Sequence, residues 1–324
     1  MKKLLCAAVG LAGLTALSTG PAAAADDWPD RPVSVVVAYG AGGGTDTLSR
    51  IFVEPLSAVL GQPVVVENRP GAGGTIGAAS VAKADPDGYT LYMMANGHSV
   101  AGAMYASLPY DPVADFQGVS LVASMPLAVL VRPDFEAETF EDLAALIKSR
   151  PGELNFASVG VGSTQHFTGA LLAEAAGLDI VHVPYQKTPE ALAALLSGEV
   201  DVLVEVLAPM LGQIESGDVK ALALTSKDRH PRLPDLPTAA ESGVDGFDVS
   251  TWYGIAMPSG GDVALAGKIS DAVAEALKDE ALLEKFSARG FIVKPSSADA
   301  FNTQIAEAVA QWSAARESAD IPQR

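Results

Sequence analysis

The sequence predicts an α/β protein with mixed or parallel sheets. It should have two domains, which two extended crossings of the chain join. Three short apolar segments are each followed by a glycine-rich turn and a helical pattern, an order typical of parallel sheets. Two longer extended segments, residues 121–132 and 249–255, interrupt this order. We expect them to carry the chain into a second domain and back. Lobe 1 then contains residues 26–124 and 253–324, and lobe 2 contains residues 125–252.

The first strand, turn and helix run from Val33 to Leu48 and continue toward Leu60. The valines form a β-branched run, which is typical of a strand buried on both faces. Residues 40–44 are almost all glycine, and Thr45 or Asp46 is expected to N-cap the helix that follows. Pro55 falls inside the helical pattern, where it should kink or shorten the helix.

A strand, a glycine turn and a helix start together favour the binding of an anion. The first N–H groups of the helix have no partner in the helix, and the helix dipole adds partial positive charge. The glycines do not match the dinucleotide fingerprint, and no lysine follows them as a phosphate loop requires. The pattern therefore predicts a small carboxylate rather than a nucleotide. An ordinary strand-to-helix turn is the alternative.

Two further strands complete the sheet expected in lobe 1. Residues 62–67 form one strand, followed by a glycine turn over 68–75 and a helix to Ala82. Residues 89–94 form the other, and Asn96 and His98 follow its carboxyl end. This βαβαβ order implies a parallel sheet with right-handed crossovers.

Lobe 2 is expected to repeat the arrangement around a third glycine turn, residues 158–166, which opens a helix. Thr188 is expected to cap another helix, with Pro189 at its first position. The other elements expected there are a helix over 140–148 and strands over 154–157, 180–183, 200–205 and 221–225. After the second crossing the chain should be helical, with Ser296 and Asp299 as a capping box before the last helix. Ligands of such folds bind outside the carboxyl ends of the strands, in the cleft between the lobes.

The amino terminus and the net charge restrict location and partners. Lys2 and Lys3 precede an apolar run of 14 residues, Leu4 to Leu17, and small residues follow to Ala25. This pattern predicts a secretory signal peptide, residues 1–25, and a periplasmic protein. Cys6 lies inside that segment, so the exported chain would have no cysteine. Without the two signal lysines, 19 basic and 39 acidic residues give a net charge of −20, which argues against nucleic acid and anionic membranes as partners.

The sequence has no motif that indicates an enzyme. It contains no G-x-S-x-G elbow and no H-E-x-x-H motif, and its four histidines lack metal-ligand spacing. We therefore expect no catalytic residue, no metal and no cofactor. A secreted hydrolase that uses Ser163 and His166 is a less favoured alternative.

Polar residues near the predicted strand ends are the candidate ligand contacts. Ser163 and Thr164 open a helix, where capping and carboxylate binding use the same geometry. His166 is either a ligand contact or a structural residue. Asp46 and Glu205 are acids that would accept hydrogen bonds from an amine or hydroxyl of the ligand, or pair with a cation, or else lie on a solvated rim.

Five other positions near the strand ends and crossings complete this prediction. Asn96 and His98 are expected in the wall of the cleft. Tyr253 and Trp252 either line the cleft or pack in the hinge, and Asp201 starts a strand without touching the ligand.

In its motifs the chain resembles the periplasmic receptors of tripartite tricarboxylate transporters, the Bug or TctC-like family. The resemblance is colinear and covers essentially the whole exported chain. The motifs that carry it are GGGTD at 42–46, GQPVVVENRPGAGG at 61–74, PDGYTL at 86–91, LPYDP at 108–112, GVGSTQH at 160–166, VHVPY at 181–185, ALALT at 221–225 and LPT at 236–238.

The resemblance implies a two-domain periplasmic binding protein of the Venus flytrap type, similar to type II, with two hinge crossings. Such a receptor binds a small organic acid (a di- or tricarboxylate, an aromatic acid or an amino acid) and delivers it to integral membrane transporter subunits. It would be a monomer without catalytic activity, cofactor or metal. A sensor that presents its ligand to a membrane signalling system is the alternative.

The resemblance also implies which residues hold the ligand carboxylate. They lie on the first and third glycine turns: Tyr39, Gly43, Thr45 and Asp46 on one lobe, and Ser158, Gly162, Ser163 and Thr164 on the other. Three departures from the family pattern leave the identity of the ligand undetermined. Ala38 and Ala41 stand where prolines are common, residues 186–189 lack the usual lysine and glycine pattern, and Glu205 replaces an aspartate or asparagine.

Overall fold

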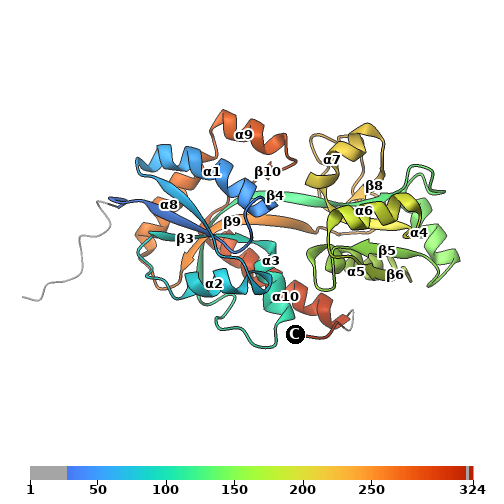
Figure 1. The fold of residues 1–324 in the computed structure, drawn as a ribbon, viewed down its shortest axis with the longest axis horizontal. Coiled ribbons are helices and arrows are strands. Elements are labelled where there is room, and N and C mark those ends of the chain that lie inside the picture. Colours follow the sequence, from blue (N-terminus) through green and yellow to red (C-terminus); the bar gives the residue numbers. More distant parts are fainter. Residues whose placement is uncertain (1–27, 319–320, 324) are drawn as a thin grey trace, which may run out of the picture.

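The computed structural model describes residues 28–318 and 321–323, and it shows two α/β lobes side by side, joined by two long strands (Figure 1). The predicted signal peptide lies outside the described residues. The joining strands are β4 (Phe116–Val131) and β9 (Ser250–Pro258). The domain boundaries expected at residues 124/125 and 252/253 fall inside these two strands, and they stay a prediction.

Lobe 1 is built from both ends of the described chain. Its strands are β1 (Val33–Val37), β2 (Val64–Asn68), β3 (Thr90–Ala95) and the short β10 (Ile292–Val293). Its helices are α1 (Gly44–Leu60), η1 (Ala72–Gly74), α2 (Thr75–Ala82), α3 (Asn96–Met104), α8 (Val263–Ala276), α9 (Glu280–Ser287) and α10 (Ala298–Ser318).

Lobe 2 is formed by the middle of the chain. Its strands are β5 (Asn155–Ser158), β6 (Val181–Pro184), β7 (Val202–Val206) and β8 (Lys220–Leu224). Its helices are α4 (Phe140–Ser149), α5 (Thr164–Ala176), α6 (Thr188–Ser197) and α7 (Leu207–Ser216).

A single mixed sheet passes through both lobes, in the order β2-β1-β3-β9-β4-β7-β5-β6, and β8 and β10 pair with β4 outside that path. Two hydrophobic clusters cover its faces. One joins α1 and α8 to α6 and α7, through residues such as Phe52, Ile269, Leu195 and Met210. The other joins α3 and α10 to α4 and α5, through residues such as Met104, Trp312, Phe140 and Phe167. Each core layer therefore extends from one lobe into the other.

The strand directions bring the loops of the two lobes together. β4 runs from lobe 1 into lobe 2, and β9 pairs antiparallel with its first part. In lobe 2, β7 also runs antiparallel to β4, with Val206 opposite Leu127, so the carboxyl end of β7 points toward lobe 1. In lobe 1, Ala95 at the carboxyl end of β3 pairs with Tyr253, near the start of β9. Because β1 is parallel to β3 and β5 to β7, all four strands end at the junction between the lobes.

Several local expectations are wrong. α1 is not shortened at Pro55 but continues to Leu60, since Phe52 and Leu56 anchor both sides of the proline in the core. The kink expected as the other outcome stays a prediction. The N-cap of α1 is Gly43, whose backbone is extended, rather than Thr45 or Asp46. Residues 96–104 form helix α3, for which no element was predicted. The segment after β9 contains β10 as well as helices.

Two other caps are displaced by one residue. Lys187 is the N-cap of α6, so Thr188 is its first helical residue and its hydroxyl serves another partner. Before α10, the hydroxyl of Ser297 accepts from the backbone N–H of Ala300, whereas the Ser296 hydroxyl accepts from Leu121 of β4.

Candidate functional site

Three helix N-termini meet at the junction of the lobes. α1 and α3 follow the parallel strands β1 and β3 of lobe 1, and α5 follows β5 of lobe 2. No side chain caps α1 or α3, so the N–H groups of their first turns stay available. The three helix dipoles add partial positive charge at this place, which can hold an anion without a cationic side chain.

The first glycine turn is held in shape by Asp46. This carboxylate is 2% exposed and accepts from the Gly42 N–H at 2.8 Å, the Asn68 amide at 2.8 Å and the Arg50 guanidinium at 3.0 Å. Burial alone would raise the pKa of Asp46, but the hydrogen bonds from Arg50, Gly42 and Asn68 outweigh it and lower the pKa below its usual value. Asp46 therefore uses its oxygens inside lobe 1, to order the turn that presents Gly43 and Thr45.

Tyr39 packs between the second glycine turn and the start of α3. A methyl group on Gly74 would lie 3.3 Å from its ring, and one on Gly97 would clash with its hydroxyl. Burial, with Tyr253 and Tyr110 nearby, raises the pKa of Tyr39 above its ordinary value. The phenol therefore keeps its proton at neutral pH and can donate it.

The third glycine turn is organised by its own side chains. The Ser163 hydroxyl accepts from the His166 N–H at 3.1 Å and so caps α5. Gly162, with a φ of 76°, donates its N–H to Nδ1 of His166 at 3.1 Å. The Ser158 hydroxyl lies 2.7 Å from Nε2 of His182. Sequence reasoning did not single out His182, which lies on the neighbouring strand β6.

His166 and His182 form a stacked pair behind this turn. Their ring centroids are 3.7 Å apart and their planes differ by 16°. Burial lowers the pKa of each to about 4, and the charge of His166 adds to the effect on His182. Both rings are therefore neutral at pH 7 and contribute hydrogen-bond dipoles rather than positive charge.

Asn96 joins the two lobes and the C-terminal helix. Its amide donates to the Thr164 hydroxyl at 3.1 Å, and its oxygen accepts from the Trp312 indole at 2.9 Å. Asn96 is 1% exposed, so both bonds are made away from water. Trp312 in turn packs against Phe167 of lobe 2, with ring centroids 5.6 Å apart. No local pattern in the sequence indicates this role of Trp312.

Glu205, near the carboxyl end of β7, is also buried, with 1% exposed. It accepts from Nε2 of Gln165 at 2.6 Å, from the Thr188 hydroxyl at 2.8 Å and from the Val206 N–H at 2.8 Å. Burial raises the pKa of Glu205 above its usual value, and these three hydrogen bonds oppose the rise. Glu205 therefore does not lie on a solvated rim of the cleft. Its hydrogen bonds to Gln165 and Thr188 were not predicted from the sequence.

The remaining candidates have structural partners. Trp252 packs edge-on against Phe301, whereas the Tyr253 hydroxyl lies beside Gly44 at the start of α1. His98 contacts the carbonyl of Pro112 at 2.8 Å. Asp201 accepts from the N–H of Asn155 and joins the starts of β5 and β7.

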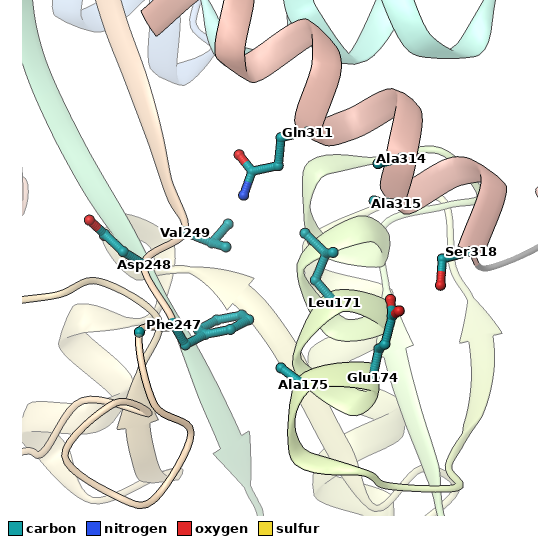
Figure 2. Close-up of a pocket in the computed structure, with 11 residues that line it drawn as sticks. Leu171, Glu174, Ala175, Phe247, Asp248, Val249, Gln311, Ala314, Ala315 and Ser318 are labelled. Atoms are coloured by element: carbon teal, nitrogen blue, oxygen red, sulfur yellow. The ribbon is translucent and has the colours of Figure 1, made fainter.

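Two hollows border the hinge on the side of α10. One is lined by residues of both crossing strands together with Asn96, Lys294 and Glu307. The other lies between α5, the segment 246–249 and α10, where Leu171, Phe247 and Val249 surround it (Figure 2).

Within residues 28–318 and 321–323, no helix is long and apolar enough to cross a membrane. In the same part of the chain, no three His, Cys, Asp or Glu side chains are placed to hold a metal ion.

Fold and site together define a two-lobed solute-binding protein of the Venus flytrap type. The model of the tripartite tricarboxylate transporter family receptor matches residues 48–320. The chain belongs to this family of periplasmic solute-binding receptors, as the sequence motifs predicted.

Individual relatives agree with this assignment. BugT of Bordetella pertussis is 35% identical over 310 residues, which cover 95% of each chain. The solved structure of the periplasmic binding protein BugD is 36% identical, with a TM-score of 0.74 over 92% of this chain and 100% of that one. MatC from Rhodopseudomonas palustris, solved with bound malate, is 33% identical, with a TM-score of 0.72 over 89% of this chain and 99% of MatC.

Proposed function

We propose that this protein is a periplasmic receptor that binds a small organic carboxylate between its lobes and delivers it to the membrane subunits of a tripartite tricarboxylate-type transporter. The observation that carries the proposal is the meeting of three helix N-termini from both lobes at one junction. Two of these helices lack a side-chain cap, so their N–H groups are free for a carboxylate. The signal-peptide pattern of residues 1–25 supports export.

The related protein MatC was solved with malate, a small carboxylic acid, which supports the same chemical class of ligand for this chain. The candidate groups here are backbone N–H groups, hydroxyls and neutral rings. Such a set binds and releases an acid. The Ser158 hydroxyl lies 2.7 Å from Nε2 of His182 but is fully buried, so it is not placed to attack a substrate. We therefore propose a non-enzymatic role.

Closure of the lobes should strengthen binding. Asn96 and Thr164 already bond across the junction. Donors fixed on both lobes replace water around the carboxylate at little further ordering cost, because secondary structure holds them in place.

Thermal unfolding against a panel of di- and tricarboxylates, aromatic acids and amino acids tests this proposal. A ligand at about 100 times its Kd stabilises the folded protein by about 2.7 kcal/mol, which raises Tm by a few degrees for a chain of this size. Absence of a shift with every acid, for folded protein free of co-purified ligand, would contradict it. Uptake of the acid by membranes that carry the transporter subunits, only when the receptor is added, tests delivery.

A pair of cap variants locates the site. Ser163→Ala should weaken binding by about 1–3 kcal/mol if the hydroxyl donates to the carboxylate. Thr139→Ala removes the equivalent cap from α4, far from the junction, and should leave the affinity unchanged. Equal affinities of both variants would place the ligand elsewhere.

A further inference from the structure

Glu205 is a buried carboxylate that is surrounded by hydrogen-bond donors and has no cation beside it. It accepts from Gln165, Thr188 and the Val206 N–H, and no ion pair in the described part of the chain includes it. Accepting three hydrogen bonds while donating none is the pattern of the ionised form. Asp46 differs, because its oxygens are occupied within the first turn, beside Arg50.

The carboxylate fixes the direction of the polar groups around it. Since Gln165 donates through Nε2, its carbonyl Oε1 is left as an acceptor, and the described residues provide no hydrogen bond to that oxygen. The Thr188 hydroxyl donates its only proton to Glu205, so the lone pairs of the Thr188 oxygen remain free to accept a hydrogen bond. Gln165 and Thr188 are both partly exposed. Lobe 2 therefore presents acceptors beside Glu205.

The first turns of the helices provide hydrogen-bond donors, in contrast to the acceptors beside Glu205. Backbone N–H groups at the first turns of α1 and α3 are donors without side-chain caps, and Ser163 caps α5 two residues before Gln165. A ligand that spans the junction meets donors at the helix starts and acceptors near Glu205. Its two ends must therefore differ in hydrogen-bonding character.

We propose that the site selects a carboxylic acid that also carries a hydroxyl or ammonium group, with Glu205, Gln165 and Thr188 as the residues that determine this specificity. This inference rests on the proposed function of a carboxylate receptor and narrows its ligand class. The donor group of the ligand bonds Gln165 Oε1 or the Thr188 oxygen, near the negative charge of Glu205. An ionised carboxylate in the same place would meet only acceptors and a like charge, which disfavours it.

Titration calorimetry on the mature protein with matched acids tests the inference. The probes are succinate with malate and aspartate, tricarballylate with citrate, and benzoate with 2-hydroxybenzoate. Within the set that binds, the member that carries a hydroxyl or ammonium group should bind about tenfold or more tightly than its unsubstituted partner, since it gains a charge-assisted hydrogen bond.

Two variants test whether Glu205 and Gln165 determine this ligand preference. Glu205→Gln removes the charge that orients Gln165, and Gln165→Met removes the acceptor at similar volume, so each should reduce the preference severalfold. The second variant keeps the test valid if the first does not fold. Glu190→Gln, an exposed residue in the first turn of α6, removes an equal charge and should retain the full preference.

The outcomes separate this inference from the proposed function. If acids bind but the unsubstituted members bind equally well or better, the receptor role stands and the inference is overturned. An unchanged preference in both Glu205→Gln and Gln165→Met would likewise overturn the role of these residues. Absence of binding by every acid in the panel would overturn the proposed function, and this inference with it.

Discussion

The side-chain amide of Asn96 lies 3.1 Å from the hydroxyl of Thr164, and this hydrogen bond links the start of α3 in lobe 1 to the start of α5 in lobe 2. The oxygen of the same side chain accepts a hydrogen bond from the indole N–H of Trp312. One buried side chain therefore connects both lobes and the C-terminal helix. The relative position of the lobes should depend on it.

Replacing Asn96 by alanine should destabilise the fold and weaken ligand binding. It leaves the buried Trp312 N–H without a partner, and an unsatisfied buried donor costs about 1–3 kcal/mol. Thr164→Val also leaves one buried donor unsatisfied, the Asn96 amide, at about 1–3 kcal/mol. It should cost less than Asn96→Ala, which in addition removes the packing of the Asn96 side chain. Urea unfolding of both single variants and the double variant measures the coupling. Additive effects would contradict a direct bond between these residues.

Asp46→Asn should destabilise lobe 1 by about 1–3 kcal/mol, because an amide replaces an oxygen that accepts from Gly42 and Arg50. The effect should depend on pH. The folded-state pKa of Asp46 is lowered, so its stabilisation is present above the unfolded-state value of about 4 and is lost as pH falls through the folded value.

Unfolding free energies of wild type and Asp46→Asn, measured at pH 7 and pH 3, test this dependence. The difference between the two proteins should shrink at pH 3. Asp87→Asn is the control, since Asp87 pairs with Arg31 on the surface and such pairs contribute little. A constant difference at both pH values would show that the Asp46 charge does not order the turn.

The stacked histidines predict a loss of stability between pH 6.5 and pH 4. Burial lowers the folded-state pKa of His166 and His182 to about 4, whereas unfolded histidine titrates near 6.5. In this window the unfolded chain binds more protons, so stability falls as pH falls. His182→Gln removes one of these groups and should flatten the dependence in urea unfolding between pH 4.5 and 6.5. Identical slopes for variant and wild type would mean that His182 is not buried as a neutral ring.

Much of the fold could be predicted from the sequence because its signals are local. The valines of β1, the glycine turns and the two extended crossings are visible without tertiary contacts. The errors arose where tertiary packing decides. α1 is not shortened at Pro55, because Phe52 and Leu56 are buried on either side, and helix α3 was not predicted at all. The caps of α6 and α10 were each misplaced by one residue, because a hydroxyl one position away had another partner.

The contacts that shape the candidate site could not be predicted, because they join residues far apart in sequence. The sequence motifs mark residues 42–46 and 160–166 as turns, but they do not show that Asp46 serves Asn68 or that Glu205 orients Gln165. Both acids are expected as ligand contacts or as rim residues. The structure shows both buried, with Asp46 bonded within the first turn and Glu205 bonded to Gln165 and Thr188. Trp312 carried no local signal, since an aromatic residue on an amphipathic helix is most often core.

The most direct measurement of the central claim is a crystal structure of the mature protein with the acid that most strongly raises its Tm. We predict electron density for the ligand between the lobes, with its carboxylate within hydrogen-bond distance of backbone N–H groups in the first turns of α1 or α3 and of α5. A ligand in the hollow between α5 and α10, beside Leu171 and Phe247, or on the outer face of one lobe, would contradict the account.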